Sequence, residues 1–462
     1  MSSFFIKHKP KFNKKRKPEV PATKTSGTAK KKKAVKEESD EEIQSDDAFV
    51  SGEESDPADL FPEPEQETAQ DKRLRLAKKY LEEIEKEEQS RAEDKEVHDL
   101  VSQRLQDEYL DSKGKLRKNI ADQYTGYNEK TIKILKNKRQ NLPLTSIVIS
   151  QNGAFMFTGC KTSFVVKWSV PSGEKLGFFD CLSHVEQING NKRRPHILAM
   201  ALSSDMRFLA LADGGNNIQI WCPDKLTHIK NFKGHRDVVT ALTFRKDTHQ
   251  LYSASKDRSV KIWSLDEMAY IESLFGHQAA ITGIDALSRE RAITSGGTDC
   301  SIRIWKITEE SQLIYNGHKG SIETVKLIND ENFVSGGDDG SLCLWSALKK
   351  KPLHIQTLVH GSQENGEANW ITAIATLLNT DLLASGSCDG FIRVWRTLNN
   401  GKTLKELFAI PMCGFVNSLA FTNDGRYLIA AVGQEHRLGR WWRIKEAKNS
   451  IVIIELNKKE SS

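Results

Sequence analysis

Three observations in the sequence predict an all-β fold, a ring of seven small sheets. Residues 234–263, 276–305 and 317–345 repeat one pattern: Gly-His, an alternating apolar run, a polar break, a second apolar run and a closing tryptophan. An aspartate precedes that tryptophan at a constant distance of six residues. Seven tryptophans recur at intervals of 40 to 53 residues: Trp168, Trp221, Trp263, Trp305, Trp345, Trp395 and Trp441. A four-stranded blade of the WD40 type takes about 40–45 residues, so the spacing predicts a seven-bladed WD40 β-propeller.

Four residues of a blade are expected to form a buried hydrogen-bonded chain, because buried polar groups need partners. In each such set, the histidine is expected to bond the aspartate, and the serine is expected to bond the indole N–H of the tryptophan. Three sets are complete: His235, Ser253, Asp257 and Trp263; His277, Ser295, Asp299 and Trp305; and His318, Ser335, Asp339 and Trp345. The sixth blade keeps Ser385, Asp389 and Trp395, with His360 displaced by an insertion, and blades one, two and seven lack the aspartate. A Ser-His-Asp set that recurs in successive blades indicates architecture rather than catalysis, so no enzyme is predicted.

Charge divides the N-terminal tail, residues 1–67, into two parts. Residues 1–36 hold 13 Lys/Arg and one acid, whereas residues 37–67 hold 14 acids and no Lys/Arg. Blocks of like charge repel themselves and are expected to stay disordered. The spacing of two basic clusters resembles a bipartite nuclear localisation signal, although they could also hold RNA phosphates. They are Lys14, Lys15, Arg16 and Lys17, and Lys30, Lys31, Lys32 and Lys33.

A helical extension is predicted over residues 68–125. Thr68 and Asp71 form a capping box. Apolar residues at helical spacing follow in two segments, of which the second should end before Gly114. They are Leu74, Ala77, Leu81 and Ile84, and then Val97, Leu100, Val101 and Leu105. This apolar stripe is narrow, and such helices are marginal alone. We expect them to dock on a partner, with packing on the propeller as the alternative.

The propeller is assigned to residues 130–457. Residues 130–462 hold 42 Lys/Arg against 32 Asp/Glu, an excess that suits a polyanionic partner; a soluble basic domain without one is the alternative. No apolar run approaches the ~18 residues of a membrane span. The seven cysteines form no Cys-x-x-Cys pair, which indicates a reduced, intracellular chain without a zinc site. We therefore predict no cofactor, no metal, no membrane partner and no small-molecule substrate.

The sequence does not decide which of two segments closes the ring. Either residues 131–135 or residues 451–456 should supply the outer strand of the last blade, because an open edge would leave backbone groups unpaired. Two insertions, residues 183–194 and 361–369, enlarge the loops that lead into blades two and six.

Two stretches are more specific than a generic repeat: residues 67–81, ahead of the ring, and residues 433–447, at the end of the last blade. Together with residues 234–237 and 248–252 they resemble the U3 small nucleolar RNA-interacting WD-repeat family, over about residues 67–456. The first blade departs from that family, which commonly has Gly-His where this chain has Asn-Leu-Pro at residues 141–143.

The resemblance implies a non-catalytic component of the U3 small nucleolar ribonucleoprotein (snoRNP), resident in the nucleus and nucleolus. Members of the family bind the B/C element of U3 snoRNA together with a small kink-turn-binding protein. They support early cleavages of the ribosomal RNA precursor, on the route to 18S rRNA and the small subunit. The implied partners are thus U3 snoRNA, the kink-turn-binding protein and other small-subunit processome proteins.

A propeller can contact RNA only through surface groups, and loops on one face of the ring are the expected place. Structured RNA is recognised through shape, phosphates and 2′-hydroxyls, which suits rigidly held guanidinium groups. Any one such residue could equally be a solvated side chain of the rim. The candidates are Arg236, Arg258, Arg437, Arg440, Lys192, Arg193 and Arg194.

A protein-interaction propeller without direct RNA binding is the second hypothesis. A ubiquitin-ligase receptor of the common kind would show Trp-Asp-x-Arg, but the residues after the seven tryptophans are Ser, Cys, Ser, Lys, Ser, Arg and Trp. A chromatin-peptide reader would need an acidic or aromatic pocket over the central channel, a feature that the sequence leaves open.

Overall fold

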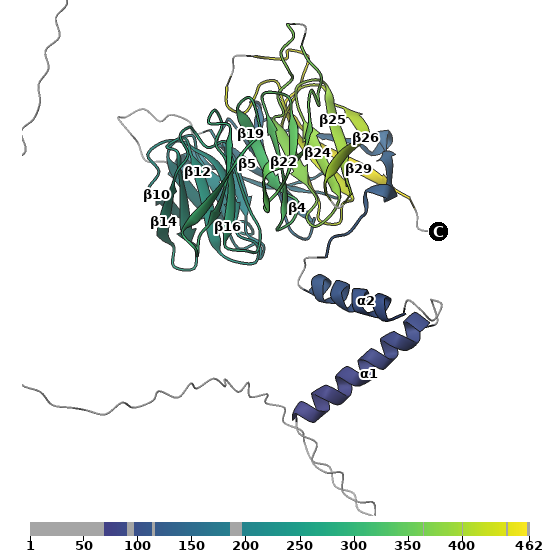
Figure 1. Cartoon of the computed structure of the whole chain (residues 1–462). Coiled ribbons are helices and arrows are strands. Elements are labelled where there is room, and N and C mark those ends of the chain that lie inside the picture. The colour runs from purple at the N-terminus through teal and green to yellow at the C-terminus, as the bar shows by residue number, and fades with distance from the viewer. Residues whose placement is uncertain are drawn as a thin grey trace, which may run out of the picture. The chain divides into compact units, whose positions relative to one another are not determined.

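The computed structural model describes residues 69–89, 97–112, 116–184, 196–363, 365–399, 401–439 and 442–459. From residue 116 onward these residues form seven antiparallel sheets, which we call blades one to seven (Figure 1). In blades one to six the strands follow one another in chain order from the centre of the ring outward. The predicted seven-bladed propeller is therefore confirmed.

The strands have the following bounds. Blade one contains β3 (Leu144–Ile149), β4 (Phe155–Cys160), β5 (Phe164–Ser169) and β6 (Lys175–Asp180). Blade two contains β7 (Ala199–Leu202), β8 (Leu209–Ala212), β9 (Asn217–Cys222) and β10 (Thr227–Lys233). Blade three contains β11 (Val239–Phe244), β12 (Gln250–Ser255), β13 (Ser259–Ser264) and β14 (Ala269–Phe275). Blade four contains β15 (Gly283–Ala286), β16 (Arg291–Ser295), β17 (Ser301–Lys306) and β18 (Ser311–Asn316).

The remaining blades follow the same plan. Blade five contains β19 (Ile322–Leu327), β20 (Asn332–Gly337), β21 (Leu342–Ser346) and β22 (Lys349–Gln356). Blade six contains β23 (Ala373–Thr376), β24 (Leu382–Gly386), β25 (Phe391–Leu398) and β26 (Thr403–Pro411). Blade seven contains β27 (Phe415–Phe421), β28 (Tyr427–Gly433) and β29 (Ser450–Lys458), with β1 (Tyr124–Tyr127) and β2 (Lys133–Leu135) outside them.

The ring is closed at its centre. The innermost strands contact one another in order, from β3 and β7 round to β23 and β27, and β27 contacts β3. Apolar side chains fill the spaces between neighbouring blades; for example, Val334 and Leu344 of blade five pack with Ile371 ahead of blade six. Because each blade buries one face against each neighbour, its strands are apolar on both faces.

Blade seven joins the two ends of the propeller. Strand β29 is its third strand, and β1 and β2 both pair with β29 from outside, with Tyr127 opposite Leu456 and Ile134 opposite Val452. Residues 131–135 and 451–456 are thus not alternatives, since each supplies a strand. The blade also takes in β1, whose first two residues, 124 and 125, fall within the predicted helical extension of residues 68–125.

A short segment that we call the strap, residues 116–123, fixes these outer strands to blade six. The Asp381 carboxylate accepts the backbone N–H groups of Ile120 (2.8 Å) and Ala121 (3.0 Å). Arg117 Nη2 donates to Thr397 Oγ1 at 3.0 Å. Directly after the strap, the buried Tyr124 donates its hydroxyl to the Gly425 carbonyl of blade seven (2.8 Å). The strap therefore joins blades six and seven from outside.

The tryptophan count misplaced the third strand of blade seven. Trp441 itself lies outside the described residues, but both its flanking segments belong to the long connection between β28 and β29. The third strand is β29, which contains no tryptophan. The interval before Trp441 resembled a blade length because this connection carries a Trp-Trp pair about as far from Trp395 as the next blade's tryptophan would be.

Two helices precede the strap within the described residues, α1 (Ala69–Gln89) and α2 (Val97–Ser112), so the predicted end of the second helix before Gly114 is confirmed. Ile84 and Val101 are buried, whereas Leu74 and Leu81 of the predicted stripe are 57% and 39% exposed. Thr68, the cap residue, lies outside the described residues. None of the described helices is long and apolar enough to span a membrane. Docking of the exposed part of this stripe on a partner stays a prediction.

His249 connects blades two and three through two hydrogen bonds. Its Nε2 lies 2.8 Å from Asp205 Oδ2 of blade two, and its Nδ1 lies 2.5 Å from Asp266 Oδ1 of blade three. These hydrogen bonds, the one to Asp266 first, raise the pKa of His249 above its usual value. A protonated ring donates to both carboxylates at once, whereas a neutral ring can donate to only one.

We expect the free energy of unfolding to fall as pH rises above about 6.5, because His249 then loses a proton in the unfolded state first and in the folded state only at higher pH. Below that pH the contribution of His249 to the free energy of unfolding is fully present. The effect should be about 1 kcal/mol or less, since these hydrogen bonds are partly exposed. Urea unfolding at a series of pH values measures it, and His249→Asn should lack this component. Parallel pH profiles of the two proteins would contradict the assignment.

Candidate nucleic-acid interface

The hydrogen-bonded chains lie where the loops of one face enter the blades. In blade three His235 Nδ1 is 2.9 Å from Asp257 Oδ2, His235 Nε2 is 2.7 Å from Ser253 Oγ, and Trp263 Nε1 is 2.9 Å from the same oxygen. An indole N–H can only donate, so Ser253 Oγ accepts from Trp263, and the Asp257 carboxylate accepts from His235 Nδ1. Blade five has the same arrangement, with Ser335 Oγ 2.7 Å from His318 and 2.8 Å from Trp345.

Blades four and six each correct one expectation. In blade four Thr294, not Ser295, bonds His277 (2.7 Å) and Trp305 (2.9 Å), while Ser295 bonds Thr282 (2.9 Å). The turn before Asp299 has one residue more than in blade three, which shifts the strand register by one. In blade six the insertion follows His360 rather than displacing it. His360 bonds Asp389 (2.8 Å) and Ser385 (2.9 Å), and Trp395 bonds Ser385 (2.9 Å).

Blade one uses an amide in place of histidine, and blade two uses an amide in place of serine. In blade one Trp168 Nε1 donates to Thr158 Oγ1 (3.0 Å), and Gln140 bonds both the side chain (3.2 Å) and the backbone carbonyl (2.8 Å) of Thr158. In blade two Trp221 Nε1 donates to Gln219 Oε1 at 3.1 Å. The first blade therefore has a polar network, although its Gly-His is missing.

The repeated Ser-His-Asp geometry serves structure. Ser253, Ser335 and Ser385 are fully buried, and each oxygen already accepts an indole N–H, so none can reach a substrate. Burial by itself raises the pKa of the Asp257 carboxyl, but hydrogen bonds from His235, Ser259 and the Arg236 backbone outweigh it and hold the pKa below its usual range. Each carboxylate thereby fixes the loop above it. The sets build a rigid face.

Two of the predicted RNA contacts, Arg236 and Arg258, lie on this face and are exposed. The Arg236 backbone N–H donates to Asp257 Oδ2 at 3.0 Å, which holds the residue over the tetrad. Lys256, which the sequence analysis did not single out, is exposed in the same turn as Arg258. We call Arg236, Lys256 and Arg258 the blade-three cluster; within the described residues none of its side chains forms an ion pair.

Arg437, by contrast, serves inside the protein. Its Nη2 donates to the Thr282 carbonyl of blade four (3.1 Å) and, at 3.5 Å, to the Glu323 carbonyl of blade five, so it crosses the channel from blade seven. The residue is partly exposed, but its Nε is buried without an acceptor among the described residues. We expected Arg437 to lie at the rim and to contact a ligand there, but the structure places it in the mouth of the channel. Arg440, Lys192, Arg193 and Arg194 lie outside the described residues.

The loop of residues 434–439, which carries Arg437, lies over the mouth of the channel. Lys161 of blade one holds it there: its Nζ donates to the carbonyls of His436 (2.8 Å) and Gly439 (3.2 Å) and lies 3.8 Å from Glu435 Oε2. Beneath the loop the channel contains a cavity of about 140 Å³, lined by strands of all seven blades. Beside it opens a wider cavity of about 440 Å³, which we call the funnel.

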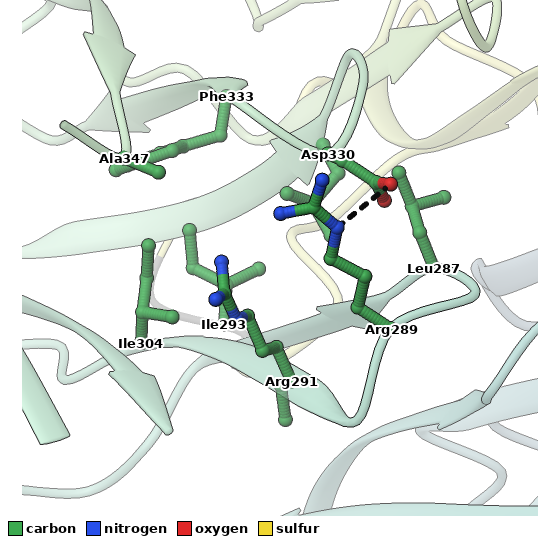
Figure 2. Close-up of a pocket in the computed structure, with 10 residues that line it drawn as sticks. Leu287, Arg289, Arg291, Ile293, Ile304, Asp330, Phe333 and Ala347 are labelled. Carbon is green, nitrogen blue, oxygen red and sulfur yellow. Dashed lines mark ion pairs between the residues drawn. The ribbon is translucent and has the colours of Figure 1, made fainter. Parts of the chain in front are cut away.

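A third hollow, of about 30 Å³, lies on the opposite face between blades four and five (Figure 2). Its floor is apolar, with Ile293, Ile304 and Phe333, and Arg289 pairs with Asp330 at its edge (Nε–Oδ2 3.1 Å). It is too small for a nucleotide. Among the described residues no group of His, Cys, Asp and Glu is arranged to hold a metal ion.

Comparisons with known proteins agree with this architecture. Four segments match the model of the WD domain, G-beta repeat: residues 226–264, 269–306, 309–346 and 356–396. They correspond to blades three to six, whose tetrads are complete. The fold, the repeats and the tetrads thus define a WD40-repeat protein.

Relatives are found in animals and plants. U3 small nucleolar RNA-interacting protein 2 of Mus musculus is 50% identical over 399 residues, which cover 85% of this chain and 83% of that protein. The U3 snoRNP-associated protein-like YAOH of Oryza sativa is 37% identical over 76% of this chain and 74% of that protein. The solved structure of U3-55K is 46% identical, with a TM-score of 0.68, over 72% of this chain and all of that chain. This chain belongs to the family of U3 small nucleolar RNA-interacting protein 2.

Proposed function

We propose that this protein binds the B/C element of U3 snoRNA through the blade-three cluster, beside a kink-turn-binding protein, as part of the U3 snoRNP. In that role it would support pre-rRNA processing toward 18S rRNA in the nucleolus, as a scaffold and not as an enzyme. The names of its relatives support the proposal, since those of mouse and human are called U3 small nucleolar RNA-interacting protein 2. A Saccharomyces cerevisiae relative, 28% identical over 165 residues, is called ribosomal RNA-processing protein 9.

The observation that carries the proposal is the blade-three cluster itself. Its three cationic residues are exposed on one face, and within the described residues no carboxylate pairs with their side chains. The backbone of Arg258 has a φ of 67°, in the left-handed region, as does Cys300 at the same position of the turn in blade four (54°), where blades five and six have Gly340 and Gly390. The turn therefore accepts a side chain here at a cost of about 1 kcal/mol. Three exposed cations without carboxylate partners are explained by an anionic ligand.

Among the described residues, blades four and five do not carry such a cluster. The residues equivalent to Arg236 and Lys256 are Gln278 and Thr298 in blade four, and Lys319 and Asp338 in blade five. Blade three is thus more basic here than these two blades, and Lys161 and Arg437 add positive charge at the channel mouth. A cationic peptide would be repelled there, so this structure does not favour a reader of basic chromatin peptides.

We expect Arg236→Glu with Arg258→Glu to weaken binding of the B/C element RNA by tenfold or more and to lower the slope of log Kd against log salt by about 2, because two phosphate contacts are lost. Arg258→Gly should also weaken binding while stability stays within about 1 kcal/mol, since it relieves the strained backbone. Filter binding at several salt concentrations and thermal unfolding measure the two effects.

Lys319→Glu is the matched control, because Lys319 occupies in blade five the position of Arg236 and its N–H bonds Asp339 in the same way (3.1 Å). It should leave the affinity nearly unchanged. Equal affinities of the wild type and the double reversal would remove the blade-three cluster from the interface. The basic clusters of residues 1–36 lie outside the described residues, and nuclear import through them stays a prediction.

A further inference from the structure

The funnel differs from the rest of this face in being both deep and basic. Blades one, two and three and the loop of residues 434–439 contribute its walls. Its volume of about 440 Å³ falls within the range of about 300–1,000 Å³ that is typical of small-ligand sites. No Asp or Glu is among the described residues that line it, whereas Lys161, Lys256 and Arg437 are. Its ligand should therefore carry negative charge.

Three polar groups of the funnel are available to a ligand. The Lys256 ammonium makes no hydrogen bond or ion pair with the described residues, and the buried Nε of Arg437 has no acceptor among them. His196 Nδ1 lies 2.7 Å from the Lys161 carbonyl. A carbonyl can only accept, so this nitrogen donates, and Nε2 is the ring nitrogen left for a ligand. The two cationic groups and this nitrogen surround the same space.

Apolar side chains complete the walls. Leu198, Val238 and Leu438 line the funnel beside these polar groups. A bare phosphate ion would leave them in contact with water, whereas a nucleotide has a flat, weakly polar base for the apolar wall and a phosphate for the cations. Proteins that recognise RNA by sequence commonly take an unstacked base into such a site and bond its edge.

We propose that the funnel takes up one unstacked nucleotide of the bound RNA, with its phosphate toward Lys256 and its base between Val238 and Leu438, where His196 Nε2 and Arg437 Nε can bond the base edge. This proposal rests on the proposed function and adds to it. The blade-three cluster borders the funnel through Lys256, so the bound RNA strand would pass from Arg258 and Arg236 toward the channel mouth.

The test uses the full chain and five RNA hairpins: four with a single bulged nucleotide that differ only in its base, and one with that nucleotide deleted. Wild type should bind at least one bulged hairpin about tenfold more tightly than the uninterrupted hairpin. Val238→Trp fills the funnel from a loop position whose backbone hydrogen bonds it leaves in place, and Lys256→Gln removes the free ammonium. Both should lose the preference. Val238→Trp should retain binding of the uninterrupted hairpin, Lys256→Gln should weaken that binding modestly because Lys256 also belongs to the blade-three cluster, and Lys319→Gln should change neither the preference nor that binding.

The outcomes separate the two proposals. Equal affinity of wild type for all five hairpins overturns the nucleotide site and leaves RNA binding by the propeller intact. A preference that survives in both Val238→Trp and Lys256→Gln, with unaltered thermal unfolding, also overturns it. Displacement of the bulged nucleotide by an acidic peptide at equal concentration would assign the funnel to a protein ligand instead. Failure of wild type to bind any hairpin at low salt overturns the proposed function itself.

Discussion

A chain that begins at residue 136 is expected to melt roughly 10 °C below the full chain and to aggregate on heating. It lacks the strap and strands β1 and β2, so the outer edge of β29 has no partner, and an open edge pairs readily with other chains. Burial of the Tyr124 side chain is lost, at about 2 kcal/mol. The buried Asp381 also loses two N–H donors, at about 1–3 kcal/mol. A total of about 4 kcal/mol corresponds to roughly 10 °C in a domain of this size.

A chain that begins at residue 116 is the matched control. It removes the tail and both helices but keeps the strap, and its melting temperature should stay close to that of the full chain. Differential scanning calorimetry compares the three proteins, and Asp381→Asn in the full chain gives an intermediate value. If the two truncated chains melted together, closure through the strap would not be what stabilises blade seven.

Arg437→Glu is expected to destabilise the protein by about 3–5 kcal/mol, the range seen when one partner of a buried charged pair is removed. The new carboxylate would lie near the carbonyls of Thr282 and Glu323, which accept the present guanidinium. It would also face the Glu323 carboxyl, whose pKa burial already raises. Because the loop of residues 434–439 would lose its anchor across the channel, the funnel should open as well.

Urea unfolding of Arg437→Glu, Arg437→Met and Arg236→Glu tests this assignment. The methionine retains most of the packing volume without a charge, so it should be less harmful than the glutamate. Arg236→Glu reverses a charge on the surface and should stay within about 0.5 kcal/mol of wild type. A free energy of unfolding for Arg437→Glu equal to that of Arg236→Glu would show that the guanidinium is not needed inside the ring.

Most of the fold was predictable because each blade repeats its own short-range chemistry. The spacing between Ser253, Asp257 and Trp263 is set within one hairpin, and the same hairpin recurs in blades five and six. Blade four differs because its turn has one additional residue, so Thr294 occupies the place expected for Ser295. In each of these blades a serine lies ten residues before the tryptophan. Ser295 lies ten residues before Trp305 as well, so this spacing does not reveal the shift in register.

The candidate site was less predictable because it depends on where loops from distant blades meet. Arg437 follows a His as Arg236 does, which made the two look equivalent, but only Arg236 follows a tetrad histidine. The loop that carries Arg437 is folded back over the channel by Lys161, 276 residues earlier in the chain. The sequence around neither residue indicates that the two are in contact. Lys256 was passed over for the same reason, since its importance comes from the cavity beside it.

Closure through blade seven also bears on how the protein is made. Tyr127 pairs with Leu456, so a strand synthesised near the beginning must wait for almost the whole chain before it meets its partner. During translation the first outer strands have no edge to join, while blades one to six can form behind them. Late pairing of this kind exposes a nascent chain to wrong contacts. We expect ribosome-bound chains that stop short of residue 450 to recruit chaperones, and release of the last strand to complete the ring in one step.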